Sequence, residues 1–329
     1  MVKLVDHVRM SAHRRAPAAL AATLSLATAL AACTTGGPSA PAASGAAGSS
    51  GSSAAASPAP DLAGAYRETL RSAADPLGSA LDGLPKARTL KSLDQRLERA
   101  QGAASDAVER LGAATPPPEV GAEHSDYLAA LRGLDGDLGT LRDAVAGHEL
   151  CAPSAVLARL GGTDGYGAVR DAGGELAAKG DYPADVARLK TPKEQSRRLA
   201  NGAFIRRGPR GGLGHLIVKN GATSDTVISV VRGKSAVTRF YIRKGKNVTV
   251  TGVPDGTYKV YYTSGSDWDR RTRAFTRDCA FKKFGKDLAF RTRRTATYIQ
   301  PMSWSITLRP VVGGNVRSVE VDPEDFPGG

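Results

Sequence analysis

VPDGTYKVYY, residues Val253–Tyr262, combines the two local signals that define the C-terminal half of this 329-residue chain. Its Pro-Asp-Gly triplet is typical of a tight turn. After the turn, side chains able to line a core recur at every second position, at Tyr258, Val260 and Tyr262. That period of two is the pattern of a strand with one buried face. The stretch therefore predicts a turn that leads into an antiparallel strand.

The same alternation recurs on both sides of this stretch. It is clearest in Arg239–Arg243 and in Trp304–Arg309. Weaker strand patterns occupy five further segments: Leu216–Lys219, Thr226–Arg232, Asn247–Thr251, Leu288–Thr292 and Arg317–Val321. Roughly eight short strands with turn residues between them predict a β-sandwich. We expect it to span residues 214–326, with residues 327–329 as a tail.

The N-terminal half has the spacing of helices instead. Leucine and alanine recur every three or four residues over Leu90–Leu111 and again over Tyr127–Val145, on either side of a proline-rich break. A shorter stripe over Leu62–Ala73 precedes Asp75-Pro76, which predicts a new helix beginning at the proline. Two weaker helical patches are Ser154–Leu160 and Ala168–Lys179. These patterns predict an α-helical bundle over residues 61–190.

Charge divides the chain at the same place. Residues 61–190 hold 15 Lys and Arg against 20 Asp and Glu, whereas residues 191–329 hold 26 against 11. The two halves therefore have net charges of −5 and +15. Such unlike parts predict a multi-domain α+β protein. We expect a basic linker over residues 191–213 between the domains, with the glycine-rich Gly208–Gly214 as its flexible end.

The N-terminus carries a secretion pattern. Arg14-Arg15 precede an apolar run over Ala16–Ala32, which ends in Leu30-Ala31-Ala32-Cys33. This arrangement resembles the lipobox of bacterial lipoproteins. The resemblance implies that residues 1–32 are a signal peptide, that Cys33 is lipidated, and that the chain is held on the extracytoplasmic face of the cell membrane. An ordinary secretory signal and a membrane-spanning helix are the alternatives, and Met10 is an alternative start.

Residues 33–60 consist almost wholly of Ala, Gly, Ser, Pro and Thr. A segment without charge or large apolar side chains cannot bury a core, so we expect a disordered linker. A flexible chain of this length spans roughly 30 Å, which suits a tether between a membrane and folded domains.

Cys151 and Cys279 are the only thiols left once Cys33 is acylated. Outside the cytoplasm two such thiols are free to oxidise, so we expect a disulfide between the two domains. The alternative is that both are buried thiols, each packed as a small apolar side chain.

Signals for catalysis are weak. Three histidines follow the expected signal peptide, namely His124, His148 and His215, and no Glu-x-x-His pair or Gly-x-Ser-x-Gly elbow occurs in the sequence. Asp267 and Asp269 flank Trp268 and form a weak candidate site for a hard cation. The alternative is that the neighbouring arginines pair with both carboxylates. We expect no enzyme activity and no cofactor.

Basic residues gather in the segment Arg270–Arg294. Ten cations alternate there with four phenylalanines and form a candidate anion-binding site: Arg270, Arg271, Arg273, Arg277, Lys282, Lys283, Lys286, Arg291, Arg293 and Arg294. Nucleic acid is an improbable partner outside the membrane, so lipid headgroups and anionic wall polymers are the expected ones. The alternative is that the phenylalanines face the core and the cations form a solvated surface.

Two further resemblances concern the C-terminal half. Val253–Val260 is similar to the P-x-G-x-Y hairpin of transthyretin-like and carboxypeptidase-regulatory-like sandwiches. Residues 216–326, with a loop at Gly265–Asp269, resemble an uncharacterised β domain of actinobacterial surface proteins. These resemblances imply an architecture and no activity. We therefore expect a non-catalytic binding or scaffolding module for anionic envelope material or an envelope protein. The alternative is an accessory or substrate-binding component of an envelope enzyme or transport system.

The lipobox generates a direct test. Replacing Cys33 with alanine removes the sulfur that would carry the acyl chains, so we expect the Cys33→Ala chain to incorporate no fatty-acid analogue during metabolic labelling. Undiminished label in this variant would contradict lipidation at Cys33.

Overall fold

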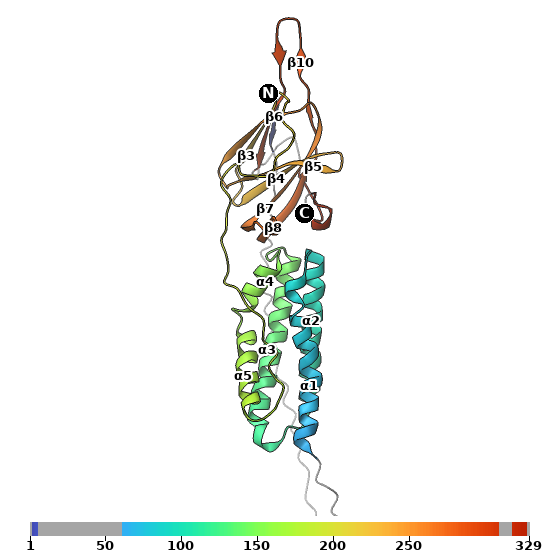
Figure 1. Cartoon of the computed structure of the whole chain (residues 1–329), viewed down its shortest axis with the longest axis vertical. Coiled ribbons are helices and arrows are strands. Elements are labelled where there is room, and N and C mark those ends of the chain that lie inside the picture. The colour runs from blue at the N-terminus through green and yellow to red at the C-terminus, as the bar shows by residue number, and fades with distance from the viewer. Residues whose placement is uncertain (1, 6–60, 309–317, 328–329) are drawn as a thin grey trace, which may run out of the picture. The chain divides into compact units, whose positions relative to one another are not determined.

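Helices and strands occupy separate halves of the chain. The computed structural model in Figure 1 describes residues 2–5, 61–308 and 318–327. Five α-helices lie between residues 62 and 178, and a mostly antiparallel set of strands follows from residue 204. Both halves belong to one compact unit. The predicted α+β class is confirmed, whereas Cys33 and residues 33–60 lie outside the described ranges.

The helical half follows the apolar periodicity closely. Its five helices are α1 (Leu62–Leu81), α2 (Leu90–Gly112), α3 (Gly121–Ala146), α4 (Pro153–Leu160) and α5 (Asp164–Ala178). Helix α2 begins with a capping box, in which the side chain of Thr89 accepts from the amide of Ser92 and the side chain of Ser92 accepts in return. The shared core consists mostly of leucine and alanine. Among the described residues, no helix has both the length and the apolar composition that a bilayer crossing requires.

The prediction of a new helix at Pro76 is wrong. Helix α1 continues through Pro76 to Leu81 as a single element. A proline inside a helix costs about 3 kcal/mol because it removes one backbone hydrogen bond and clashes with the preceding turn. The buried side chains continue in register past it, at Leu77 and Leu81, on the same core as Leu70. Burial of this stripe outweighs the proline's local preference.

Helices α3 and α5 approach closely where both carry glycine. The amide of Gly165 donates to Oδ2 of Asp137 at 3.0 Å. A Cβ atom added to Gly165 would lie 2.5 Å from the carbonyl carbon of Gly133 and 2.6 Å from the amide nitrogen of Leu134. Only a residue without a side chain fits between the two backbones at this point.

The strands form two main sheets and one small hairpin. A four-stranded sheet has the order β1-β12-β3-β6, and a seven-stranded sheet has the order β13-β8-β7-β4-β5-β2 with β9 beside β7. The small hairpin pairs β10 with β11. The bounds are β1 (Val2–Val5), β2 (Phe204–Arg206), β3 (Gly214–Asn220), β4 (Asp225–Arg232), β5 (Ser235–Ile242), β6 (Asn247–Val253), β7 (Gly256–Asp269), β8 (Ala274–Phe284), β9 (Leu288–Phe290), β10 (Arg293–Arg294), β11 (Ile299–Gln300), β12 (Ser303–Leu308) and β13 (Ser318–Glu320). Strand β1 lies within the expected signal peptide, and cleavage before Cys33 would leave β12 as the edge.

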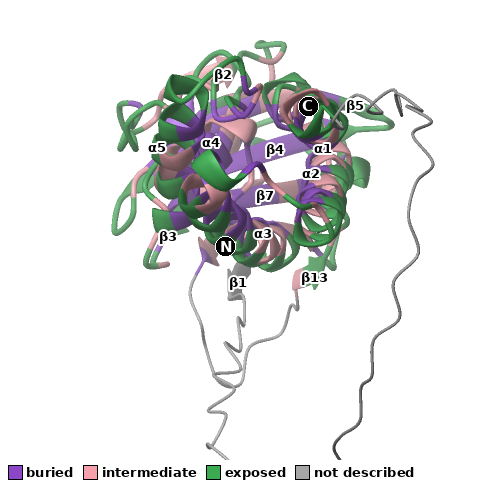
Figure 2. Cartoon of the chain, turned by 90° about the horizontal axis from the view of Figure 1, so that it is seen from below, coloured by how far each residue is buried: buried purple, intermediate pink, exposed green. Residues whose placement is uncertain are grey.

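The seven-stranded sheet is buried on both faces. One face shares a core with the four-stranded sheet, to which Val218, Phe240 and Ile306 contribute. The other face carries a second cluster around Tyr241 and Trp268. The central strand β4 is buried along nearly its whole length, as Figure 2 also shows for the part of it in view. Burial on both faces explains why Tyr241, which the alternation placed on the polar side of its strand, is fully enclosed.

Strand β8, which lies inside the basic segment, was not predicted from the sequence. Between Ala280 and Arg277, β8 has one residue more than the stretch of β7 that it opposes, and Asp278 has a φ of 53°. This is a β-bulge, which interrupts the two-residue alternation by which strands are recognised. The expected loop at Gly265–Asp269 is likewise wrong, because β7 continues to Asp269.

The glycine contact between α3 and α5 predicts opposite effects of one substitution at two positions. We expect Gly165→Ala to lower the free energy of unfolding by about 1–3 kcal/mol, since the added methyl group overpacks the crossing. Gly136→Ala is the matched control, because its Cβ would meet no atom within 4 Å and alanine favours a helix. We expect this control to stabilise the protein by about 0.5–1 kcal/mol in urea unfolding. Equal effects would contradict the close contact.

Candidate functional site

The ten cations of the candidate anion-binding site do not lie on a single patch. Strand β8 separates its two ends, and 11 residues of extended chain span roughly 35 Å. The cations therefore divide into three sets along this length. A turn set joins β7 to β8, a middle set lies on β8, and a distal set follows β8. The sets are Arg270, Arg271 and Arg273; Arg277, Lys282 and Lys283; and Lys286, Arg291, Arg293 and Arg294.

The middle set is engaged within the protein. Arg277 forms an ion pair with Glu194. Nζ of Lys282 lies 3.9 Å from a carboxylate oxygen of Glu320, and Nζ of Lys283 lies 5.7 Å from the ring centre of Tyr261. Arg277 and Lys282 therefore have acidic partners within the protein, whereas Lys283 contacts only an aromatic ring.

The turn set is exposed at the end of the β7–β8 hairpin. Its geometry is fixed by Asp269, whose Oδ1 accepts from the amide of Arg271 at 2.8 Å. The three guanidinium groups form no ion pair within the described residues. The turn Arg270–Arg273 therefore carries three exposed cations and no apolar side chain.

The distal set surrounds the hairpin of β10 and β11, which Figure 1 labels at β10. Asp255 fixes its base, since the two carboxylate oxygens accept from the amide and the hydroxyl of Thr292, both at 2.9 Å. Tyr298 and Ile299 on the hairpin are 57% and 52% exposed. Arg291 and Arg293 also line a surface hollow of about 370 Å3 with Met302 and Ile217, among other residues. Cations and exposed apolar side chains thus coincide here.

The phenylalanines of the basic segment face the interior. Phe275, Phe284 and Phe290 are fully buried, and Phe281 packs against the cluster around Trp268. The alternative prediction, that these phenylalanines face the core, is therefore confirmed. Their rings are not exposed for stacking on a ligand. Lys286 instead lies over the buried Trp304, 5.9 Å from its ring centre.

Asp267 and Asp269 are held by an arginine from the expected linker. Nε and Nη2 of Arg197 donate to the two carboxylate oxygens of Asp267 at 2.9 and 2.7 Å, and Thr276 donates to it at 2.7 Å. Burial alone would raise the pKa of Asp267, but the hydrogen bonds from Arg197 and Thr276 outweigh burial and lower that pKa. Among the described residues, no cluster could hold a metal ion. The weak metal site is therefore not supported, and the pairing arginine precedes the two carboxylates instead of following them.

A second buried carboxylate, Asp225, is held in the same way. Arg198 donates to both of its oxygens, at 2.6 and 2.5 Å, and the hydroxyl of Tyr241 and the amide of Lys244 donate as well. Burial raises the pKa of Asp225, yet these four donors lower it overall. We refer to the two pairs, Arg197–Asp267 and Arg198–Asp225, as the arginine latch. The only signal for it in the sequence is the adjacent Arg197-Arg198 in a segment without helix or strand pattern.

The segment expected to be a flexible linker is fixed to the sheets. Besides the arginine latch, Leu199 is buried in the cluster around Trp268. Further along, the amide of Gly212 donates to the carbonyl of Gly252 at 3.2 Å. A side chain at Gly208 or Gly212 would collide with Thr238 or with Val253 and Pro254. Gly208 and Gly212 therefore permit close packing of the segment against the sheets.

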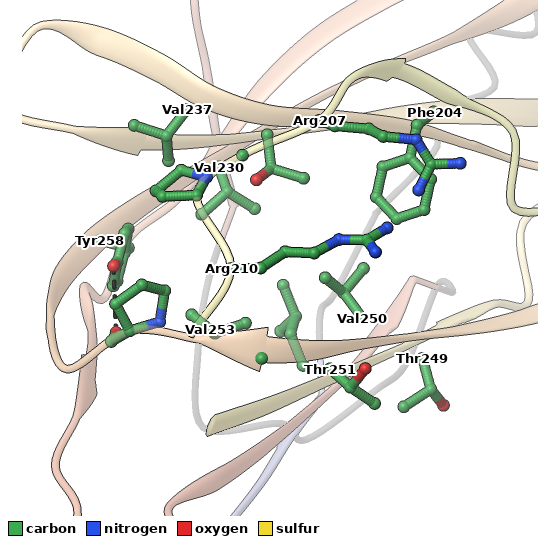
Figure 3. Close-up of a pocket in the computed structure, with 16 residues that line it drawn as sticks. Phe204, Arg207, Arg210, Val230, Val237, Thr249, Val250, Thr251, Val253 and Tyr258 are labelled. Carbon is green, nitrogen blue, oxygen red and sulfur yellow. Dashed lines mark hydrogen bonds between the residues drawn. The ribbon is translucent and has the colours of Figure 1, made fainter. Parts of the chain in front are cut away.

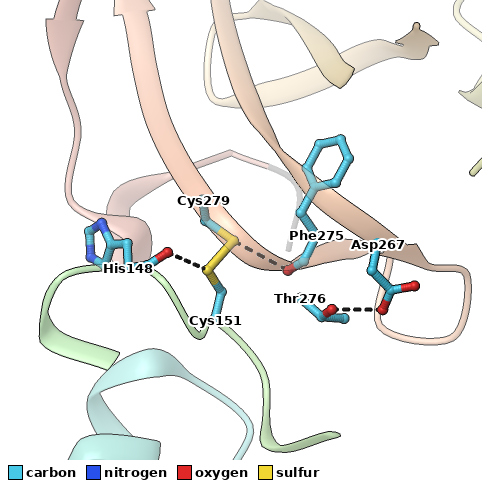
Figure 4. Close-up of a disulfide and its surroundings, with 6 residues drawn as sticks. All are labelled: His148, Cys151, Asp267, Phe275, Thr276 and Cys279. Atoms are coloured by element: carbon cyan, nitrogen blue, oxygen red, sulfur yellow. Dashed lines mark hydrogen bonds between the residues drawn. A yellow bond between two sulfur atoms is a disulfide. The ribbon is translucent and has the colours of Figure 1, made fainter. Parts of the chain in front are cut away.

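The predicted disulfide between Cys151 and Cys279 is confirmed. The two Cα atoms lie 6.4 Å apart, and Figure 4 shows the bond between the α3–α4 loop and β8. Two backbone hydrogen bonds accompany the disulfide. The amide of Cys151 donates to the carbonyl oxygen of Thr276 at 2.8 Å, and the amide of Cys279 donates to the carbonyl oxygen of His148 at 2.9 Å. The loop thus extends the edge of the sheet at the bulge of β8.

Of the three histidines, His124 lies in the helical core. His124 is buried, and its Nδ1 lies 2.8 Å from the hydroxyl of Tyr66. Burial lowers the pKa of His124, and burial together with the neighbouring Tyr182 raises the pKa of Tyr66 to about 12. The pair satisfies buried polar groups in the helical core.

The arginine latch predicts a specific acid sensitivity. Both carboxylates have lowered pKa values in the folded protein, so their stabilisation is complete above the ordinary aspartate pKa of about 3.9 and is lost as the pH falls through the folded values. We expect Asp225→Asn and Asp267→Asn each to cost about 1–3 kcal/mol at pH 7 and to reduce the loss of stability between pH 7 and pH 3. Urea unfolding at both pH values measures this effect. Asp287→Asn, at an exposed position, is the control. An acid-dependent loss as large in both variants as in the parent protein would contradict the latch.

Comparisons with known proteins complete the description of the site. Searches of protein-family models, of curated proteins and of solved structures find no match for this chain. The resemblances noted in the sequence therefore stay predictions.

Proposed function

We propose that the chain is a lipid-anchored, extracytoplasmic binding module whose distal cations hold anionic envelope material. The observation that carries this proposal is the β10–β11 hairpin with its neighbours. Arg291, Arg293 and Arg294 are exposed there beside Tyr298 and Ile299, and the three guanidinium groups form no ion pair within the described ranges. An anionic surface would supply the missing counter-charges.

The chemistry of the hairpin favours anionic lipid headgroups over a purely polar polymer. Arginine binds phosphate groups through two parallel hydrogen bonds, and tyrosine prefers the boundary between water and acyl chains. An exposed isoleucine beside them would enter the same boundary. The expected lipid at Cys33 and the linker over residues 33–60 would keep the folded part of the chain close to a membrane.

We further propose that the two halves are a helical bundle and a β-sandwich that present this hairpin. Support for the bundle comes from one apolar core shared by α1, α2, α3 and α5. Support for the sandwich comes from one core to which both main sheets contribute. No residue is assigned a catalytic role in this proposal, which describes a binding or scaffolding protein without a cofactor.

Salt-dependent binding to vesicles tests the proposal. The mature chain, residues 33–329 with Cys33→Ala, lacks both the expected signal peptide and the lipid anchor. It would be sedimented with phosphatidylglycerol vesicles and with neutral phosphatidylcholine vesicles. We expect binding to the anionic vesicles alone, strong at 50 mM salt and lost before 1 M, where the screening length is about 3 Å. Replacing Arg291, Arg293 and Arg294 by serine should weaken binding about 100-fold, at about 1 kcal/mol for each cation.

The turn set supplies the matched control. Replacing Arg270, Arg271 and Arg273 by serine removes the same charge at the opposite end of β8, so we expect a much smaller loss of binding. Equal losses in the two triple variants would mean that only net charge matters. Absence of binding at low salt would contradict the proposal altogether.

A further inference from the structure

We propose that a cavity between the edges of the two main sheets binds an amphiphile with an anionic head, such as an alkyl phosphate or a fatty acid. The cavity has a volume of about 280 Å3 and lies beneath the segment 207–213 (Figure 3). None of the distal cations lines it. This site is therefore separate from the membrane contact proposed above and goes beyond it.

The segment 207–213 crosses from one sheet to the other. It leaves the seven-stranded sheet after β2, where Gly208 packs against Thr238 of β5. It reaches the four-stranded sheet where the amide of Gly212 donates a hydrogen bond to the carbonyl oxygen of Gly252 on β6. Because both ends are fixed in this way, the segment bridges the gap between two sheet edges and leaves a hollow beneath it.

The floor of the hollow, which is the part that adjoins the core between the sheets, is apolar, although Thr249 and Thr251 also line the cavity. It is formed by side chains of the core between the sheets, with Leu216, Val230 and Val250 from three different strands. Tyr258 also lines it, but its hydroxyl donates to the carbonyl of Pro254 at 3.0 Å, which leaves mainly its ring for a ligand. An aliphatic chain is the kind of group that such a floor would accommodate.

The mouth of the hollow is cationic. Arg207 and Arg210 project from the bridging segment, and Figure 3 shows both side chains extending toward Phe204. The guanidinium carbon of Arg207 lies 4.5 Å from the ring centre of Phe204. No acidic residue lines the cavity, and neither arginine forms an ion pair within the described residues. Two unpaired guanidinium groups above an apolar floor match an anionic head with an aliphatic tail.

Calorimetric titration of the mature chain, residues 33–329 with Cys33→Ala, tests the inference. The probes would be decyl phosphate and decanoate below their micelle concentrations, with inorganic phosphate and decanol as the isolated head and tail chemistries. We expect one binding site for decyl phosphate or decanoate, and binding at least tenfold weaker for inorganic phosphate and for decanol. Whichever anionic probe binds tighter identifies the preferred head. Equal affinity for inorganic phosphate, or for decanol, would overturn the proposal without any variant.

Single substitutions locate the site. Arg207→Gln and Arg210→Gln should each weaken decyl phosphate binding about tenfold, because each removes a charge-assisted hydrogen bond. Arg206→Gln is the matched control, since Arg206 is exposed on β2 and does not line the cavity. We expect no change for the control. Unchanged binding in both cavity variants would overturn the assignment, while the vesicle experiment on the hairpin would be unaffected by that result.

Discussion

Two carboxylates enclosed in the seven-stranded sheet impose the main constraint on this structure. A buried charge is costly unless it is paired and hydrogen-bonded, and Asp225 and Asp267 lie on strands whose two faces are covered. Arg197 and Arg198 meet this requirement from a segment without regular structure. These two ion pairs fix the position of the chain that leads into β2. The positions of the bridging segment 207–213, which follows β2, and of the cavity beneath it depend on them.

The sequence predicts those elements whose pattern is local. Helix α2 was recognisable from its leucine spacing, and the end of β5 from the two-residue alternation over Arg239–Arg243. The disulfide was predictable on the expectation that Cys33 is acylated, which leaves Cys151 and Cys279 to pair. Long-range pairing was not predictable, since Arg197 and Asp267 are 70 residues apart and nothing in either neighbourhood indicates the other. Strand β8 was missed because its bulge at Asp278 interrupts the alternation that would have revealed it.

Nearness in sequence was a poor guide to the candidate site. Arg270 and Arg294 belong to one basic segment, yet a whole strand separates the turn set from the distal set. Arg277 looked like part of a common surface, although it pairs with Glu194 from the segment before the arginine latch. Conversely, Arg207 and Arg210 were not predicted to bind a ligand, because they lie outside that segment in a glycine-rich stretch. The fold, more than the charge density, decides which cations are free to meet a ligand.

The bond between Cys151 and Cys279 also determines how the molecule would carry mechanical load. If the chain is tethered at Cys33 and bound at the β10–β11 hairpin, as proposed, a force applied between these two points would act on the chain on either side of the disulfide. Tension would run along the helical half to Cys151, cross the sulfur–sulfur bond to Cys279, and continue through the end of β8 to the hairpin. The 128-residue span between the two cysteines is bypassed. The arginine latch, the bridging segment and the cavity all lie within this span, so they would keep their geometry while the rest of the molecule was stretched.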